Sequence, residues 1–203
     1  MRDFQKPGRS AVYATNGMCA TSHPLAAAVA IETLKAGGNA VDAALAGAVL
    51  LGFCEPQMTG LGGDLFALVS PGPGQDIVAL NASGRAPAGL SAADLRAQGH
   101  TAMPVAAPES VTIPGAVNGI CSLSERYGCL GLDAVLAPAI RYADEGVPVA
   151  PRVAFDWARA TDRLQGPARQ RHRYAGSGRR RAGARGWRPG SRRFRRHPAG
   201  CGG

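Results

Sequence analysis

The stretch Glu55–Phe66, with the sequence EPQMTGLGGDLF, decides the fold, because the hydrophobic pattern changes from helical to strand-like across it. Before it, Ala40–Gly52 is dense in alanine, leucine and valine, which is typical of a buried helix. After it, Phe66–Val69 and Ile77–Leu80 flank the turn-forming Pro71–Asp76 and predict an antiparallel hairpin. Helices on both sides of such a hairpin predict an α+β fold with an antiparallel sheet, not a doubly wound parallel one.

The glycines of this stretch do not form a nucleotide-binding loop. In a dinucleotide fingerprint that begins at Gly60, the third glycine would fall at Leu65. A phosphate-binding loop must also open a helix, whereas the sequence after Gly63 is strand-like. The glycines more simply allow close backbone packing where the chain enters a central strand. No cofactor is predicted.

The segments before this stretch predict a strand followed by two helices. Val12–Ala20 has the pattern of an opening strand, and a helix follows from Pro24 to Lys35, with Ser22 as its N-cap. The pair Gly37-Gly38 supplies the left-handed residue that ends this helix, and Asn39 can cap the next one. Beyond the hairpin we expect a Ser91-capped helix to Gln98 and helices over Ala116–Tyr127, Leu132–Glu145 and Pro151–Leu164.

The chain contains two unrelated compositions. Residues 166–203 hold twelve arginines but no lysine, no acidic residue and no Leu, Ile, Val or Met. Residues 1–165 carry eleven basic against fourteen acidic side chains, so the tail alone makes the whole chain basic. Such a tail cannot build a core, because it has almost no aliphatic area to bury. We predict a partial domain over residues 1–165 and a disordered or out-of-frame tail over residues 166–203.

Two interpretations of the tail remain open. Runs such as Arg192–Arg196, with nearby aromatic residues, are typical of a nucleic-acid-binding arm. Natural arms mix lysine with arginine, since either neutralises a phosphate, whereas arginine, glycine, alanine and proline are the residues of GC-rich codons. The composition therefore favours a frameshift near Leu164 or Gln165, and we do not expect nucleic acid as a partner. Salt-dependent binding of RNA or duplex DNA that requires residues 166–203 would support the arm.

Neither the start of the chain nor its apolar runs indicate membrane insertion. Met1–Pro7 lacks the apolar core of a secretory signal, and Ala43–Phe53 is much shorter than the ~20 residues that span a bilayer. The five cysteines are odd in number and lack a C-x-x-C spacing, which supports neither a disulfide framework nor a zinc site. We expect a cytoplasmic protein without a metal, in which the first four cysteines are buried free thiols.

Several short motifs, in this order and at these separations, resemble the gamma-glutamyltranspeptidase family, also called glutathione hydrolases. They are Gly17-Met18, Leu34–Ala44 (LKAGGNAVDAA), Gly60–Gly63 (GLGG), Val111–Val117 (VTIPGAV) and Leu136–Ile140 (LAPAI). The resemblance extends from about Tyr13 to about Leu164. It implies an N-terminal-nucleophile hydrolase fold, a four-layer αββα sandwich of which this chain is an incomplete, N-terminal part of the large subunit.

The resemblance also implies a self-cleaving precursor whose new N-terminal threonine is the nucleophile, with its own amino group as base. The family's cleavage segment begins Thr-Thr-His, and these 203 residues contain no such segment. Thr21-Ser22-His23 looks similar but precedes a predicted helix, so no catalytic residue is assigned. We expect this chain to be inactive, whereas the intact protein would transfer a gamma-glutamyl group to water or an amine.

Arg85 is the one candidate substrate-binding residue. The resemblance implies an arginine after the hairpin that holds the α-carboxylate of the gamma-glutamyl group by a charge-assisted contact. The family pattern is Arg-Glu-x-Ala-Pro, but Ser83–Pro87 here reads SGRAP, which moves the guanidinium two residues along, about 6.6 Å of extended chain. Arg85 therefore reaches the same carboxylate only with a different local backbone, or it binds another acyl donor. The structural alternative is a turn arginine paired with a nearby carboxylate.

The remaining polar candidates are predicted to be structural. Glu55 precedes Pro56 at a helix end, and Asp64 in the glycine turn can accept backbone hydrogen bonds. His100, His172 and His197 lack a paired carboxylate or cysteine. Two further functions stay open: a family amidohydrolase for another small acyl or amide substrate, and a non-enzymatic binder that carries a basic arm.

Overall fold

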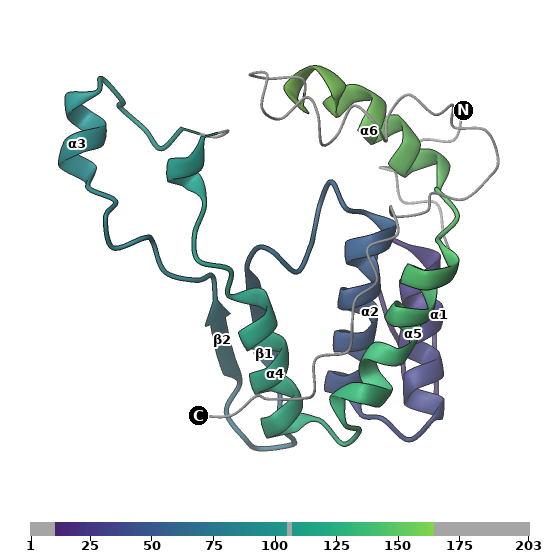
Figure 1. The fold of residues 1–203 in the computed structure, drawn as a ribbon. Coiled ribbons are helices and arrows are strands. Elements are labelled where there is room, and N and C mark those ends of the chain that lie inside the picture. The colour runs from purple at the N-terminus through teal and green to yellow at the C-terminus, as the bar shows by residue number, and fades with distance from the viewer. Residues whose placement is uncertain (1–10, 105–106, 165–203) are drawn as a thin grey trace.

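The computed structural model describes residues 11–104 and 107–164. Its largest compact part is a layer of helices. Helix α1 (Pro24–Lys35) and helix α2 (Ala40–Cys54) lie side by side, and α5 (Leu132–Glu145) packs on α2 (Figure 1). Leu50 of α2, Val29 of α1 and Val135 of α5 are almost fully buried where the three helices meet. These apolar side chains account for the alanine- and leucine-rich pattern of the sequence.

The turn between α1 and α2 follows from its polar residues. Gly37 has a φ of 95°, which supplies the left-handed step after α1. Asn39 then caps α2, because its side chain accepts hydrogen bonds from the backbone N–H groups of Val41 and Asp42. The Asp42 carboxylate accepts in return from the Asn39 N–H at 3.0 Å, which completes a capping box. Both predicted signals at this turn are confirmed.

Two predictions for the first 24 residues are wrong. Val12–Ala20 forms no strand, and all of its residues except Cys19 are exposed, with Val12 and Tyr13 at 71% and 90%. Ser22 is not the cap of α1. His23 caps it instead, since its Nδ1 accepts from the Leu25 N–H at 3.2 Å. The helix begins directly after His23, which leaves Ser22 one residue too early to cap it.

The hairpin consists of β1 (Leu65–Val69) and β2 (Val78–Ala82), paired antiparallel from Leu65↔Ala82 to Val69↔Val78. The prediction of an antiparallel hairpin is confirmed, with bounds shifted by one or two residues. Alternate side chains of both strands are half-buried, and those of Leu65, Ala67, Val69 and Leu80 pack against the core. Helix α4 (Ala116–Tyr127) contacts both strands, and the side chains on the opposite face of the hairpin are exposed.

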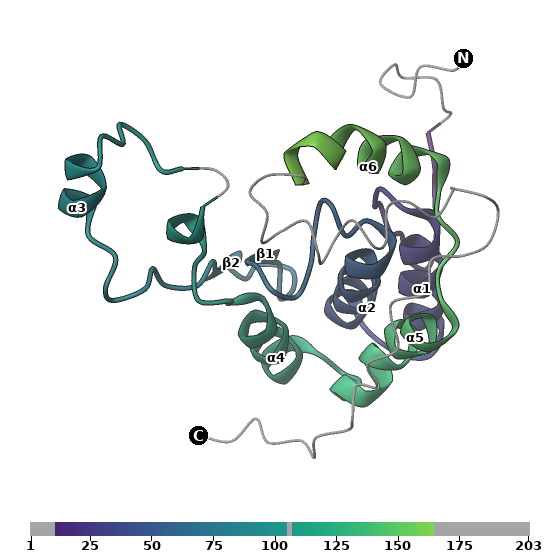
Figure 2. The ribbon, with the colours of Figure 1, turned by 45° about the horizontal axis from the view of Figure 1, so that its top comes forward.

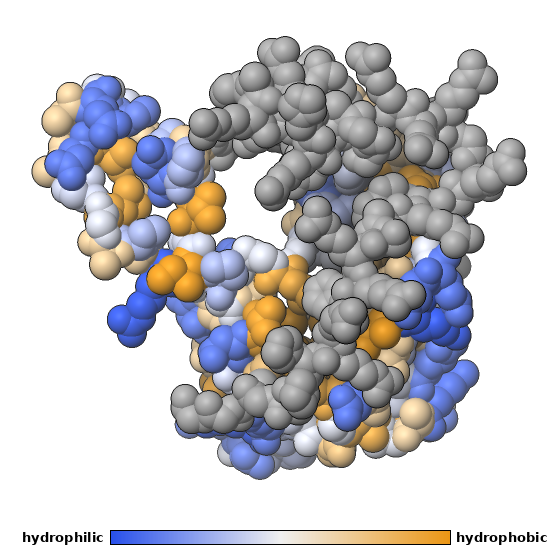
Figure 3. All heavy atoms as spheres, viewed as in Figure 1, coloured by the Kyte–Doolittle hydropathy of each residue, from blue (hydrophilic) through white to orange (hydrophobic). Residues whose placement is uncertain are grey.

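The remaining elements lie outside this arrangement. Helix α3 (Ala92–Ala97), capped by Ser91 as predicted, belongs to an excursion between β2 and α4 that also carries the short 3-10 helix η1 (Pro108–Ser110). This excursion stands away from the helical layer in both ribbon views (Figure 1, Figure 2). Figure 3 shows apolar residues at the surface of the excursion and of the neighbouring region over the hairpin and α4.

Helix α6 (Pro151–Leu164) lies across one end of α1 and α2 (Figure 2). The predicted bounds of α4, α5 and α6 are confirmed. Helices together with an antiparallel pair of strands also confirm the α+β class. The four-layer sandwich stays a prediction, and residues 166–203, with the proposed frameshift and the basic arm, lie outside the described residues.

Candidate functional site

Three segments that are distant in the sequence meet at one end of the hairpin. The carbonyl oxygen of Gly63, just before β1, accepts hydrogen bonds from the N–H groups of Gly115 and Ala116, at 3.0 Å each. The carbonyl oxygen of Arg85, just after β2, accepts from the Ile113 N–H at 2.9 Å. We call this place the Gly63–Arg85–Ala116 junction. It joins the glycine-rich loop, the end of β2 and the start of α4.

A side-chain contact strengthens the junction. The Thr112 hydroxyl donates to the Ser83 carbonyl oxygen at 3.0 Å. The Ser83 N–H donates to the Asn81 side-chain oxygen, also at 3.0 Å. The carbonyl oxygen of Ser83, which stands where the family pattern has its arginine, is therefore linked to the other segment through the Thr112 side chain. Two of the motifs that carry the family resemblance, Gly60–Gly63 and Val111–Val117, are in direct contact here.

The junction requires glycine at two positions. Gly84 has a φ of 78°, and a Cβ atom there would collide with the carbonyl oxygen of Ile113. A Cβ on Gly115 would collide with the carbonyl oxygen of Ala82 and lie 2.7 Å from the Gly84 nitrogen. L-residues rarely adopt the conformation of Gly84. A different local backbone beside Arg85, where the family pattern has glutamate in place of Gly84, stays a prediction.

Arg85 itself has a fixed backbone and an exposed side chain. Its carbonyl oxygen is held by Ile113, whereas the described residues offer its guanidinium no ion pair. The structural alternative, a turn arginine paired with a neighbouring carboxylate, is therefore not observed in the described part of the chain. Its role as a carboxylate ligand stays a prediction.

The other predicted polar residues lie elsewhere. Glu55 ends α2, where its N–H donates to the Leu51 carbonyl oxygen at 2.7 Å and its carboxylate accepts from the Ser22 hydroxyl at 2.6 Å. Asp64 is exposed just before β1, and His100 is exposed just after α3. The structure gives Glu55 the structural contact at the helix end that the sequence predicts. His172 and His197 lie outside the described residues.

A buried carboxylate that sequence reasoning missed connects α2 to the loop between α4 and α5. Asp42 has no exposed surface, and its Oδ2 accepts from the backbone N–H groups of Cys129 at 2.9 Å and Leu130 at 3.2 Å, in addition to Asn39. Asn39 extends the link, since its side-chain amide donates to the Tyr127 carbonyl oxygen. The spacing Asn39-x-x-Asp42 indicates a capping box and was the available signal; the long-range contacts depend on the tertiary structure.

A second missed contact holds the glycine-rich loop. The indole N–H of Trp157 on α6 donates to the side-chain oxygen of Gln57 at 3.0 Å. The loop from Pro56 to Gly63 is therefore held at both ends, by α6 through Gln57 and by α4 through Gly63. No local sequence signal connects residues 100 positions apart, so this contact could not be predicted.

The cysteines differ in environment. Burial, with a smaller contribution from the adjacent Glu55 charge, raises the pKa of the Cys54 thiol to about 11. A thiol that stays protonated at neutral pH is a poor nucleophile, so Cys54 is a structural residue. The prediction that the first four cysteines are buried is confirmed for Cys54 alone, since Cys19 and Cys121 are partly buried and Cys129 is exposed. Cys129 lies in the α4–α5 loop, where no core covers it.

Residues 11–104 and 107–164 contain neither a candidate metal cluster nor a candidate membrane-spanning helix. No group of three or more His, Cys, Asp or Glu residues in those ranges could hold a metal ion. None of the helices described there is long and apolar enough to cross a membrane.

Comparisons with known proteins connect this geometry to a class of enzymes. The solved structure of a cephalosporin acylase from Bacillus halodurans is 46% identical, with a TM-score of 0.71, and the match covers 80% of this chain and 30% of that one. The solved gamma-glutamyltranspeptidase of Helicobacter pylori is 26% identical with the same TM-score, over 80% of this chain and 47% of that one. The fold is thus shared with enzymes named for acyl and gamma-glutamyl transfer.

The family model described as gamma-glutamyltranspeptidase matches residues 26–185, and the chain belongs to this family. The glutathione hydrolase proenzyme of Bacillus subtilis (strain 168) is 34% identical over 138 residues, which is 66% of this chain and 24% of that relative. The chain thus spans about a quarter of the length of this curated relative. The family match also continues past Leu164 into the arginine-rich segment.

Proposed function

We propose that this chain is the N-terminal part of an enzyme that transfers an acyl group from a small amide donor to water or an amine. In the proposed reaction a threonine hydroxyl attacks the donor amide, the amine leaves with a proton, and water or a second amine then takes the acyl group from the resulting ester. Membership of the gamma-glutamyltranspeptidase family supports this reaction type. The given 203 residues contain no Thr-Thr-His segment, so we propose that this chain alone is inactive.

One observation carries the assignment of a binding residue: Arg85 lies on a glycine-fixed backbone with its guanidinium exposed and unpaired within the described residues. A guanidinium presents planar, paired N–H donors that match a carboxylate. We propose that Arg85 binds the carboxylate of the acyl donor. A gamma-glutamyl donor carries such a group on the carbon that also bears its amine.

A second candidate donor has its own support. Gly84 replaces the glutamate of the family pattern and adopts a left-handed φ, so the guanidinium leaves the backbone at a different place. The 46% identity to a protein named as a cephalosporin acylase points in the same direction. We therefore propose, as the alternative, an amidohydrolase whose donor is another carboxylate-bearing acyl group.

Two measurements test these proposals. Hydrolysis of gamma-glutamyl-p-nitroanilide by the purified chain should not exceed that of a chain lacking residues 166–203; clear turnover would refute the inactivity. Binding of L-glutamate and of glutarate should be weak, and Arg85→Ala should weaken it by about tenfold or more. Arg96→Ala, which removes another exposed arginine, on α3, is the matched control. Equal effects of the two substitutions would remove Arg85 from the site.

The two donors are separated by the same titration. Preference for L-glutamate over glutarate would support the gamma-glutamyl donor, because only L-glutamate carries the α-amino group. Equal affinities would favour the amidohydrolase alternative. A comparison of donor amides on an intact close relative provides the kinetic counterpart, and preference there for gamma-glutamyl donors would exclude the alternative.

A further inference from the structure

The glycine-rich loop, Pro56–Gly63, has one half that is fixed locally and one half that is not. Its first half is a turn at the end of α2, in which the Met58 N–H donates to the Glu55 carbonyl oxygen at 2.9 Å. Its second half contains glycine at positions 60, 62 and 63. Glycine loses more conformational freedom on ordering than any other residue. The position of the second half therefore depends on the contacts at the two ends of the loop.

Gln57 connects the first half of the loop to α6. Its side-chain oxygen accepts from the Trp157 indole N–H at 3.0 Å, and both side chains are partly buried. Helix α6 lies across one end of α1 and α2 (Figure 2) and has Val153 buried, with 5% of its surface exposed. The contact between Trp157 and Gln57 therefore fixes the loop relative to the helical layer.

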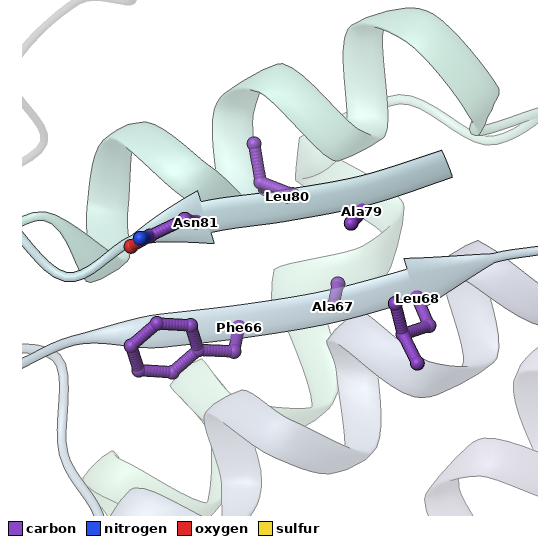
Figure 4. A pocket seen from close by; sticks show the side chains of 6 residues that line it. All are labelled: Phe66, Ala67, Leu68, Ala79, Leu80 and Asn81. Atoms are coloured by element: carbon purple, nitrogen blue, oxygen red, sulfur yellow. The ribbon is translucent and has the colours of Figure 1, made fainter. Parts of the chain in front are cut away.

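The strand register brings the other end of the loop close to the Arg85 segment. Phe66 pairs with Asn81. Figure 4 shows Phe66 near the start of β1 beside Asn81 near the end of β2. The loop thus enters β1 at the same end of the hairpin at which the chain leaves β2 toward Arg85.

A continuous set of hydrogen bonds connects this end of the loop to Arg85. The Gly63 carbonyl oxygen accepts from the N–H groups of Gly115 and Ala116 at 3.0 Å each. Two residues before Gly115, the Ile113 N–H donates to the Arg85 carbonyl oxygen at 2.9 Å. Because so short a segment joins the two contacts, a displacement of the Gly63 oxygen is transmitted to the backbone of Arg85.

We propose that Trp157 and Gln57 are positioning residues for the Arg85 site. The indole fixes the first half of the glycine-rich loop, the loop fixes the start of α4, and the start of α4 fixes the backbone from which the guanidinium extends. Contacts between a guanidinium and a carboxylate depend on geometry, so a displaced guanidinium binds more weakly. The inference rests on the proposed role of Arg85 in binding the donor carboxylate, and the coupling is measured separately from that role.

Hydrogen exchange of the full chain, resolved by residue with NMR, tests the coupling without a ligand. Gln57→Met removes the acceptor, and the N–H groups of Gly115 and Ala116 should then exchange about threefold to tenfold faster, as expected for the loss of about one hydrogen bond. The N–H groups of Cys129 and Leu130, which are held near the start of α2, should keep their rates. Unchanged rates at Gly115 and Ala116, or an equal rise at all four positions, would overturn the proposal.

Three further variants assign the effect to this hydrogen bond. Gln75→Met is the matched control, because Gln75 is exposed in the turn at the other end of the hairpin, and it should leave the exchange at the start of α4 unchanged. Gln57→Glu keeps an oxygen that can accept from the indole and should restore slow exchange. Trp157→Phe combined with Gln57→Met should add little to Gln57→Met alone, since both remove the same bond. Equal effects of the two methionine variants, or no rescue by Gln57→Glu, would contradict the proposal.

Titration of the same variants with L-glutamate connects the coupling to the proposed site. Gln57→Met should weaken binding by about threefold to tenfold, which is less than Arg85→Ala, because the guanidinium is displaced and not removed. Gln57→Glu should recover the affinity. If the wild type binds and Gln57→Met binds equally well, the loop does not position Arg85 and the inference is wrong. If the wild type does not bind, the proposed role of Arg85 fails, whereas the exchange rates still decide the coupling.

Discussion

The helical layer and the hairpin differ in how much of their apolar surface is covered. In the layer of α1, α2 and α5, Leu50, Val29 and Val135 lose nearly all contact with solvent. In the hairpin, the inner face contacts α4 and the core, whereas Phe66 and Leu68 on the outer face remain exposed. The apolar side chains of the helices are therefore buried against one another within the described chain. The hairpin packs only one of its two faces against this core.

The largest expected difference in stability is between substitutions of a leucine in the helical layer and of a leucine in the hairpin. Leu50→Ala should destabilise the chain by about 2–5 kcal/mol, since it leaves a cavity in the close-packed helical layer. Leu68→Ala, on the outer face of the hairpin, should change stability by only about 0.5 kcal/mol or less in the monomer. Urea denaturation at low protein concentration measures both. Similar losses for the two variants would mean that the regions do not differ as the structure indicates.

The next effect tests the junction between the hairpin and α4. Gly84→Ala should destabilise by about 2–4 kcal/mol, because the left-handed φ is strained for alanine and the new Cβ meets the Ile113 carbonyl oxygen. Gly74→Ala is the control: its φ of 74° is similar, but no atom lies within 4 Å of the added Cβ. Thermal melts of both variants measure the loss of stability. The difference between them is the part that comes from the steric clash, because both glycines have a left-handed φ. If Gly74→Ala costs as much, the close approach of the two segments does not stabilise the fold.

A smaller effect concerns the pH dependence of the helical layer. The pKa of Cys54 is raised from 9.0 to about 11 in the folded chain, so the folded state holds this proton more tightly than the unfolded state. The stabilisation is fully present below pH 9 and is lost as the pH rises from 9 to about 11, by roughly 2 kcal/mol. Denaturation of the wild type and of Cys54→Ala across this range measures it. An equal loss of stability in both proteins would assign it to other groups.

The smallest effect compares two helix caps. Asn39→Ala should cost about 1 kcal/mol or somewhat more, because Asn39 caps α2 and also donates to the Tyr127 carbonyl oxygen. Ser91→Ala removes the cap of α3, which lies on the excursion, so its effect on global unfolding should be smaller. Chemical denaturation of the two variants gives the comparison. A larger loss for Ser91→Ala would show that the excursion belongs to the cooperative core.

The helix caps and strands show which features of the fold could be predicted from the sequence. Asn39 and Ser91 were recognised as caps because a cap acts within three residues of its own position. The hairpin was recognised from its turn and its apolar runs, which are also local features. The interpretation of Val12–Ala20 failed, because an apolar run becomes a strand only beside another strand, and the described structure provides none there. Ser22 was preferred over His23 because serine is the commoner cap.

In the candidate site, too, the local motifs were recognised from the sequence, whereas the contacts between them were not. The sequence identified Arg85, the glycine-rich loop and the segment Val111–Val117 as separate motifs. It could not show that these segments contact one another through Gly63, Ile113 and Ala116, or that Trp157 holds Gln57. Those contacts join distant positions, so no local pattern encodes them.

By itself, the sequence determined the order and type of most elements, the family resemblance and the change of composition after Leu164. These properties depend on local backbone preferences and on residue identity. The tertiary structure alone decided the burial of Asp42, the requirement for glycine at position 84 and the exposure of one face of the hairpin. Each of these depends on which distant segment approaches a residue, and that is fixed only when the helices and the hairpin pack together.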